Sequence, residues 1–335
     1  MGFISPLKTG LYIGKDYLSF SILKSNGRNY QIVNSVVIPL TKNSVRHSPI
    51  ESNILNADEI KGHLKKILLD FPKIKSISLS LPDLSSRMIL IEIKNGIPPL
   101  DELNQMIKWN MEQKFIMKIG ESCYSHQLIS QSGQLIKKEI SKSGSKNIYN
   151  LLGIAILKNI LAEYENAPVS LHRIPKMINC ASLNLFNLYH DLIFKKWPVG
   201  NFLFLSVLDN YFTLMVFEKG ILQYIRTVGM RQTDNNADEG RDQTDENNRL
   251  KIINHIESVL PYHYQDVKSK AEIQIFITGL PDLPKEMIEF AEHYQLTLAL
   301  LVPEMVTSVE GVGKVNSVEM TKLLPSIAAA AGALN

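Results

Sequence analysis

The order of predicted strands and helices repeats along the chain, and this repeat constrains the fold more than any other feature. Each half contains three strands, a helix and a fourth strand. Leu18, Phe20 and Ile22 alternate with serines, the period of two that is typical of a half-buried strand. The first half is predicted to hold strands at 11–14, 18–22, 30–40 and 77–81 and a helix between Asp58 and Pro72. The second half is predicted to hold strands at 202–207, 212–217, 221–226 and 273–278 and a helix containing Leu250, Ile253, Ile256 and Leu260.

This order predicts an α/β fold with a duplicated core, in which two mixed sheets carry helical cover. A block from 82 to 145 interrupts the first half and is predicted to be a small α+β insertion. Its elements are strands at 87–94, 123–129 and 135–140, a helix at 100–115 and an exposed loop at 141–146.

The main body is predicted to resume with a central strand at 151–157, where the chain is apolar. A helix at 158–166, a short strand at 169–171 and a helix after Pro175 follow. We therefore predict a first domain of residues 1–81 plus 146–174, an inserted subdomain of 82–145 and a second domain of 175–335. Residues 231–248 are polar and lack hydrophobic periodicity, which predicts a loop.

Composition excludes several classes of function. The 335 residues carry a net charge of +3, and their basic residues are dispersed, so we expect no nucleic-acid partner. The two cysteines, Cys123 and Cys180, have no CxxC spacing and predict neither a disulfide framework nor a zinc site. No apolar run is long enough to cross a bilayer, so we expect a cytoplasmic protein that reaches the inner membrane only through partners.

Several short motifs, in their order and spacing, resemble those of one family. They are Gly10-Leu11-Tyr12-Ile13-Gly14, Leu79-Ser80-Leu81-Pro82, Leu100-Asp101-Glu102-Leu103 with Ile107-Lys108-Trp109-Asn110-Met111-Glu112, Tyr124-Ser125-His126-Gln127-Leu128, Arg226-Thr227-Val228-Gly229 and the alanine-rich end from Leu324. From end to end the chain resembles the PilM-like proteins of type IV pilus assembly, which have an actin-like fold.

The resemblance implies a scaffold on the cytoplasmic face of the inner membrane. PilM-like proteins bind the short N-terminal peptide of the membrane protein PilN and help to connect the assembly platform to the motor ATPases. In that family the inserted subdomain and its neighbouring cleft bind the peptide. The sequence leaves open whether the chain forms a homo-oligomer. A related alternative is the cytoplasmic L-type module of type II secretion.

The nucleotide site of the actin-like fold needs three glycine-rich turns, and this chain departs from each. In the first, between Gly10 and Gly14, Tyr12 replaces the acidic residue that would position the metal. In the second, Ser206 and Leu208 replace Asp and Gly, and in the third Leu280 follows Gly279 in place of a second glycine. We therefore expect no cofactor, no metal and no ATPase activity. The alternative is an ATP/Mg-dependent switch in which Lys15 and Asp16 contact phosphate and metal.

The inserted block supplies the candidate peptide site. Trp109 lies off the main apolar stripe of its helix, where an exposed side chain could anchor a peptide, although core packing is an equal alternative. The strand at 87–94 could form one wall of the groove. The candidate residues are Arg87, Ile89, Ile91, Leu103, Ile107, Trp109, Met111 and Phe115.

Overall fold

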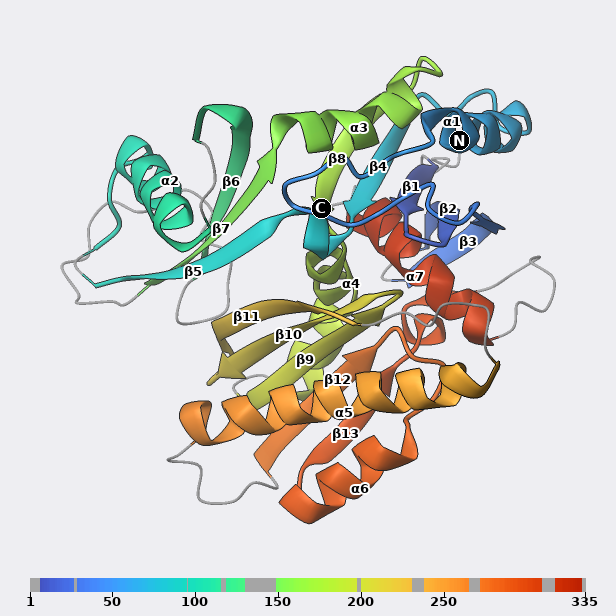
Figure 1. Cartoon of the computed structure of the whole chain (residues 1–335). Helices are drawn as coiled ribbons and strands as arrows, with labels where there is room; N and C mark the ends of the chain where they lie inside the picture. The colour runs from blue at the N-terminus through green and yellow to red at the C-terminus, as the bar shows by residue number, and fades with distance from the viewer. Residues whose placement is uncertain are drawn as a thin grey trace.

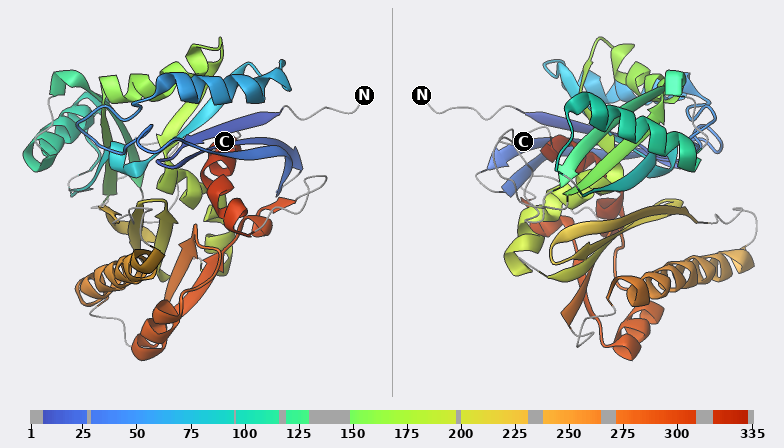
Figure 2. Two further views of the ribbon diagram at one scale, coloured as in Figure 1. Left: turned by 45° about the vertical axis from the view of Figure 1, so that its right-hand side comes forward. Right: turned by 90° about the vertical axis from the view of Figure 1, so that its left-hand side faces the viewer.

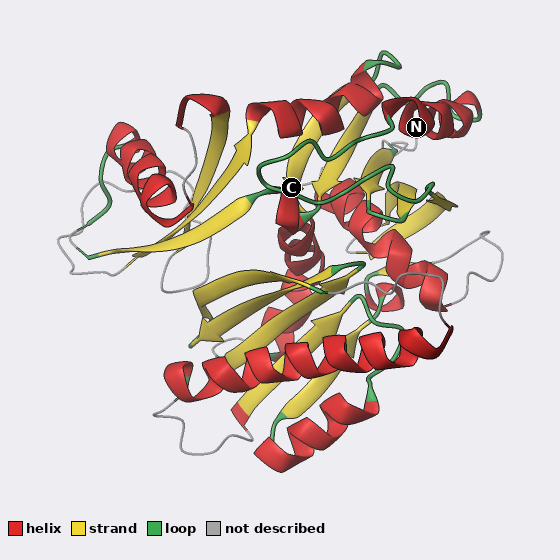
Figure 3. Cartoon of the chain, in the orientation of Figure 1, coloured by secondary structure: helices red, strands yellow, loops and turns green. Residues whose placement is uncertain are grey.

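The computed structural model contains three sheets and seven α-helices in the part of the chain that it describes (Figures 1 and 3). The described residues are 7–26, 29–94, 96–115, 119–129, 149–197, 200–230, 238–264, 272–308 and 317–332. In the helix that begins at residue 238, side chains are described only from residue 246 onward. The predicted strand at 135–140 and the loop at 141–146 lie outside these residues.

The first sheet has the order β14-β3-β2-β1-β4-β8. Its strands are β1 (Lys8–Ile13), β2 (Tyr17–Asn26), β3 (Asn29–Pro39), β4 (Ser76–Leu81), β8 (Ile174–Cys180) and β14 (Thr307–Ser308). The first three strands form the predicted antiparallel meander, and β1, β4 and β8 run parallel. Helices α1 (Ala57–Leu69) and α3 (Lys158–Val169) cover one face through a core that includes Leu64, Ile77 and Ile160.

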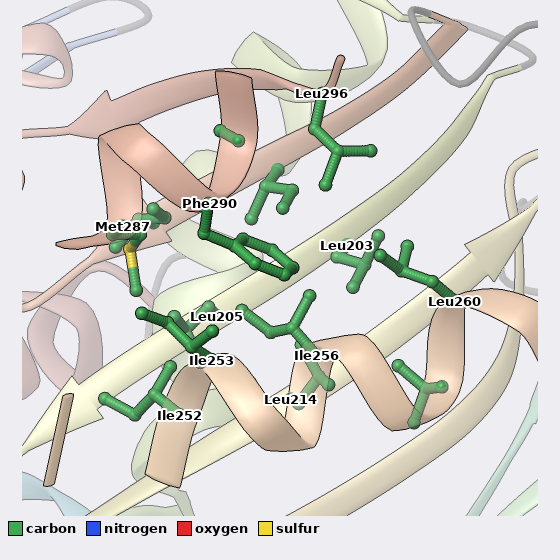
Figure 4. Packing of buried hydrophobic residues seen from close by; sticks show 14 of the residues in the cluster. Leu203, Leu205, Leu214, Ile252, Ile253, Ile256, Leu260, Met287, Phe290 and Leu296 are labelled. Carbon is green, nitrogen blue, oxygen red and sulfur yellow. The ribbon is translucent and has the colours of Figure 1, made fainter. Parts of the chain in front are cut away.

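The second sheet repeats this arrangement, with the order β11-β10-β9-β12-β13. Its strands are β9 (Asn201–Leu208), β10 (Tyr211–Glu218), β11 (Ile221–Gly229), β12 (Ile273–Thr278) and β13 (Thr297–Leu301). Helices α5 (Asp238–His263) and α6 (Lys285–Tyr294) pack on its outer face. Figure 4 shows the apolar contacts of Ile253, Ile256 and Phe290 with the sheet. The duplicated core predicted from the sequence is thus confirmed.

The third sheet belongs to the insertion and has the order β5-β7-β6. Strands β5 (Arg87–Ile93), β6 (Ser122–Ile129) and β7 (Tyr149–Leu157) are antiparallel neighbours, and α2 (Leu100–Phe115) packs on them. The apolar run at 151–157 was predicted to be a central strand of the main body, and it is instead the central strand of the insertion. The insertion therefore extends to Leu157 and does not end at 145.

Two other predicted boundaries are wrong. The predicted strand at 169–171 is the end of α3 and the turn after it, and Pro175 lies within β8, so α4 (Ala181–Lys196) begins only at Ala181. The prediction failed because β8 is an edge strand with polar and apolar residues mixed, which gave no clear period. The first domain therefore continues to Cys180. Residues 238–248, predicted as loop, form the start of α5.

Helices α4 and α7 (Ser317–Gly332) lie between the two sheets (Figure 2). The aromatic side chains Phe202, Phe204 and Phe217 of the second sheet pack against the α4 side of this layer. Helix α7 packs on β1, β2 and β4, so the end of the chain returns to the first domain and was wrongly assigned to the second. No helix in the described ranges is long and apolar enough to span a bilayer.

Candidate functional site

The turns after β1 and after β9 meet at the junction of the two domains. The backbone N–H of Lys15 donates to Asp209 Oδ2 at 3.3 Å. A Cβ at Gly14 would lie 2.5 Å from the same Asp209 oxygen, so the absence of a side chain at Gly14 allows the two turns to approach. These are the first and second turns expected to surround phosphates in an actin-type site, and here a carboxylate of the protein lies between them.

Large side chains fill the junction beside these turns. Tyr12 and Tyr211 are fully buried, Leu208 is almost so, and all three belong to one apolar cluster. Burial is the main cause that raises the pKa of Tyr12 well above its ordinary value, and the nearby Asp209 adds to it. At neutral pH the buried Tyr12 side chain is therefore a neutral phenol. A neutral phenol is a poor metal ligand.

Asp209 is the most strongly perturbed carboxyl group at the junction. Burial raises its pKa to about 7. Hydrogen bonds from Tyr17 and from the backbone of Lys15 favour the charged form, while the neighbouring charge of Asp16 disfavours it. Asp209 can consequently change its protonation state near neutral pH in a place where both domains touch it.

A second buried carboxylate joins the domains beside the first. Asp83 begins a short 3-10 helix (Asp83–Ser85) after β4, and its Oδ2 accepts a hydrogen bond of 2.6 Å from Thr213 of β10. Its Oδ1 accepts one of 3.1 Å from the backbone N–H of Ser182, in the first turn of α4. Burial is the dominant cause that raises the pKa of Asp83. Sequence reasoning missed this residue, although an acidic side chain directly after the Leu81-Pro82 strand end was a visible signal.

A loop of the first domain also reaches this junction. His47 Nδ1 lies 2.9 Å from Asn210 Oδ1 in the turn after β9. The loop is held by Asn53, whose side chain donates to Ser85 Oγ at 2.7 Å. Burial lowers the pKa of His47 to about 4, so its ring is neutral at neutral pH. The junction is therefore made of side chains from the turns, the loop and the short helix.

The remaining residues of the expected nucleotide turns serve the fold in the structure. Gly10 lies within β1, not in the turn, and a Cβ there would collide with the Ser326 carbonyl of α7. Gly279 has φ +89°, and a Cβ would collide with the Val207 carbonyl. Ser206 is buried within β9, opposite Thr213, and Leu280 packs against the core of the second domain.

Most of the candidate peptide-binding residues form the interior of the insertion. Five of them are buried between α2 and the sheet, namely Ile89, Ile91, Leu103, Ile107 and Met111. Their side chains pack inside the insertion and are not exposed as anchors for a peptide, which leaves only the main chain of β5 available for contact at Ile89 and Ile91. The guanidinium of Arg87 lies 5.5 Å from the centre of the Phe115 ring. Trp109 remains available, with 62% of its surface exposed.

The described residues contain no group of three or more His, Cys, Asp or Glu side chains that could hold a metal ion. Cys180 is buried and hydrogen-bonded to Ser86 at 3.3 Å, and burial raises the pKa of its thiol to about 12. The thiol is therefore protonated and unreactive at neutral pH.

No protein-family model and no curated protein matches this sequence. Solved structures do match. A chain of a PilM–PilN type IV pilus biogenesis complex superposes with a TM-score of 0.75 at 14% identity, over 98% of this chain and 97% of that one. A Bacteroides thetaiotaomicron protein of unknown function, described as having the actin-like ATPase fold, superposes with a TM-score of 0.52 at 12% identity, over 95% of each chain.

The chain has the actin-like fold. The fold expected from the PilM-like resemblance is thereby confirmed. A third structure, the cytoplasmic domain of EpsL, an inner membrane component of the type II secretion system of Vibrio cholerae, superposes with a TM-score of 0.44 at 10% identity over 95% of this chain and 94% of that one.

Proposed function

We propose that this protein is a cytoplasmic scaffold of a type IV pilus assembly platform that binds the N-terminal peptide of a PilN-type membrane protein. The observation that carries the proposal is the superposition along nearly the whole of both chains on a chain of the PilM–PilN complex. The superposition takes in the insertion as well as the duplicated core. In this role, binding to its membrane-protein partner would hold the protein at the inner membrane. The protein would in turn link that partner to the motor ATPases.

The proposal includes loss of nucleotide chemistry. Its support is the contact between Lys15 and Asp209, which places a carboxylate between the two turns that would surround phosphates. A phosphate there would have to displace a buried acidic group and then lie beside its charge. Tyr12 and Leu208 occupy further space at the same junction. The alternative is an ATP-dependent switch, and titration with Mg-ATP separates the two.

The insertion is the proposed peptide site. Strands β5 and β6 are the outer strands of its sheet, so within the described residues each has one edge without a strand partner. An extended peptide can pair with such an edge through main-chain hydrogen bonds, and pockets or exposed aromatic side chains then supply specificity. Trp109 is the exposed aromatic residue of α2, on the helix that covers this sheet.

The experiment is a calorimetric titration of the full chain with a synthetic PilN-type N-terminal peptide from the same genome. Trp109→Ala is expected to weaken binding by about tenfold or more, as for an interface aromatic anchor. Tyr262→Ala is the matched control, because Tyr262 is 78% exposed on α5 in the second domain. Peptide binding that Trp109→Ala leaves unchanged would place the site elsewhere, and absence of saturable binding would refute the proposed partner.

A further inference from the structure

Basic residues lie at the end of the first sheet where its parallel strands begin, opposite to the turn after β1 that contacts Asp209. Because β1, β4 and β8 are parallel, their N-terminal ends meet at one edge of the sheet. Helices α1 and α3 each run back toward this edge before β4 and β8 begin. Both helices lie along the top of Figure 1, above the first sheet. The basic residues at this edge, which we call the basic edge, are Lys8, Lys66, Lys73, Lys75, Arg173 and Lys176.

Hydrogen bonds hold the two turns of the basic edge together. The backbone N–H of Ile174 donates to the Lys75 carbonyl at 2.9 Å, which joins the turn before β8 to the turn before β4. Thr9 Oγ1 donates to the Ser76 carbonyl at 2.6 Å, which joins the start of β1 to the start of β4. Lys8 and Lys176 are close enough for their like charges to lower the pKa of Lys8, after the larger effect of burial.

Negative charge is sparse on this surface. Asp70 is the one acidic residue in 69–76 and 169–176. The carbonyl ends of α1 and α3 carry partial negative charge, and that charge accounts for some of the lysines as helix-terminus partners. Lys8 and Lys176 lie on strands β1 and β8 and not at a helix end.

Large apolar side chains are exposed among these basic groups. Leu69 at the end of α1 is 69% exposed, Ile174 at the start of β8 is 67% exposed and Val169 at the end of α3 is 49% exposed. The carbonyl of Lys75 is bonded to Ile174 itself, and Leu69 precedes Lys73 by one tight turn. A single exposed apolar residue is ordinary. Here three such residues lie at the ends of adjacent elements among lysine and arginine, so the surface is both basic and apolar.

We propose that the basic edge docks directly on an anionic bilayer surface. Lysine and arginine are attracted to acidic lipid headgroups, and leucine, isoleucine and valine side chains can enter the boundary between headgroups and acyl chains. An acidic protein surface would complement the charges but would leave Leu69 and Ile174 without an apolar environment. The contact is separate from peptide binding at the insertion and would hold the scaffold at the membrane in addition to any partner.

The test is flotation of the full chain with vesicles that contain no partner protein. We expect binding to vesicles of phosphatidylcholine with phosphatidylglycerol, little binding to vesicles of phosphatidylcholine alone, and release as salt screens the charges. Because no PilN-type peptide is present, the result is independent of the proposed function. Absence of binding to the anionic vesicles would overturn the proposal.

Variants locate the surface. Lys73→Glu with Lys75→Glu is expected to lower partition onto anionic vesicles by about tenfold or more, since each basic residue near the surface contributes a several-fold effect. Lys195→Glu with Lys196→Glu changes the net charge equally at exposed positions at the end of α4, and is expected to keep the wild-type partition. An equal loss in both pairs, or in neither, would overturn the assignment to the basic edge.

Two further experiments distinguish a bilayer from an acidic protein as the binding partner of the basic edge. Leu69→Ser with Ile174→Ser should weaken vesicle binding while leaving all the lysines in place. Soluble polyglutamate serves as a probe for purely electrostatic association. Binding to polyglutamate without binding to anionic vesicles would contradict docking on a bilayer and favour an acidic protein partner. Vesicle binding that the Leu69 and Ile174 substitutions leave intact would contradict the insertion of these side chains into the bilayer, on which the choice of a bilayer over an acidic protein rests.

Discussion

Thr213 donates a hydrogen bond of 2.6 Å to Asp83, and this bond joins the second sheet to the first domain at a buried position. Thr213→Val removes the hydroxyl while keeping the shape of the side chain. Because the buried carboxyl of Asp83 then loses a donor, the free energy of unfolding should fall by about 1.5–3 kcal/mol. Denaturation in urea measures the change.

Thr227→Val is the matched control for that prediction. The Thr227 hydroxyl lies 2.9 Å from Thr213 Oγ1, and Thr213 is the link to Asp83. Its loss should cost about 0.5–1.5 kcal/mol, the ordinary range for a neutral hydrogen bond. Equal free energies of unfolding for the two variants would show that the bond to Asp83 stabilises the protein no more than an ordinary neutral hydrogen bond.

Asp209 predicts a pH dependence of stability. Burial raises its pKa to about 7 in the folded chain, against an ordinary value of 3.8. The folded state therefore favours the protonated form, and the stability that this gives is lost as pH rises from the ordinary value through the folded value. Relative to Asp209→Asn, wild-type stability should fall between these values by up to about 1.4 kcal/mol per pH unit. Above neutral pH the Asn variant should be the more stable protein.

The measurement is urea denaturation of both proteins across that pH window. The difference between them removes the contributions of other groups, such as His47, whose pKa burial lowers. A constant difference between wild type and Asp209→Asn across the window would contradict the raised pKa.

Gly10 is predicted to be required for the contact between α7 and the first sheet. A Cβ at this position would meet the backbone at Ser326 and Ala330. Gly10→Ala should lower stability by about 1–3 kcal/mol or more, the usual effect of overpacking. Gly62→Ala should instead raise it by about 0.5–1 kcal/mol, because Gly62 lies inside α1 with no atom within 4 Å of a built Cβ. Thermal denaturation of both variants tests the pair, and a neutral Gly10→Ala would contradict the close packing.

Two residues of α2 should separate folding from binding. Ile107 is fully buried in the core of the insertion, so Ile107→Ala should cost about 2–5 kcal/mol. Trp109 is exposed, and Trp109→Ala should change stability by less than about 0.5 kcal/mol. Hydrogen exchange of α2 would report both effects. A large loss of protection in Trp109→Ala would mean that this side chain packs and does not serve as a free anchor.

The sequence predicted the parts of the fold that local patterns determine. The antiparallel meander at β1 to β3 followed from alternating residues such as Leu18 and Phe20, and α2 followed from the stripe that includes Leu103 and Ile107. Edge strand β8 was missed, because Lys176 and Met177 interrupt any clear alternation. The sheet to which the 151–157 run belongs was also missed, since an apolar strand has the same pattern in either sheet.

The site was harder to predict than the fold, because its contacts join residues far apart in the sequence. Tyr12 and Leu208 were recognised as departures from a nucleotide site, but the carboxylate of Asp209 between the turns could only be seen in three dimensions. The amphipathic pattern of α2 does not identify the surface against which its apolar face packs. Its apolar residues were therefore open to two interpretations, and the structure decides for the core in all but Trp109 and the Arg87–Phe115 contact.

The central claim is a peptide-binding scaffold that works without nucleotide. The measurement that tests it most directly is calorimetric titration of the full chain with Mg-ATP, followed by titration with the PilN-type peptide in the presence and absence of Mg-ATP. We expect no heat of binding for Mg-ATP and saturable peptide binding with the same Kd in both conditions. Saturable Mg-ATP binding at micromolar concentration, or a peptide Kd that changes with nucleotide, would contradict the account and identify the protein as a switch.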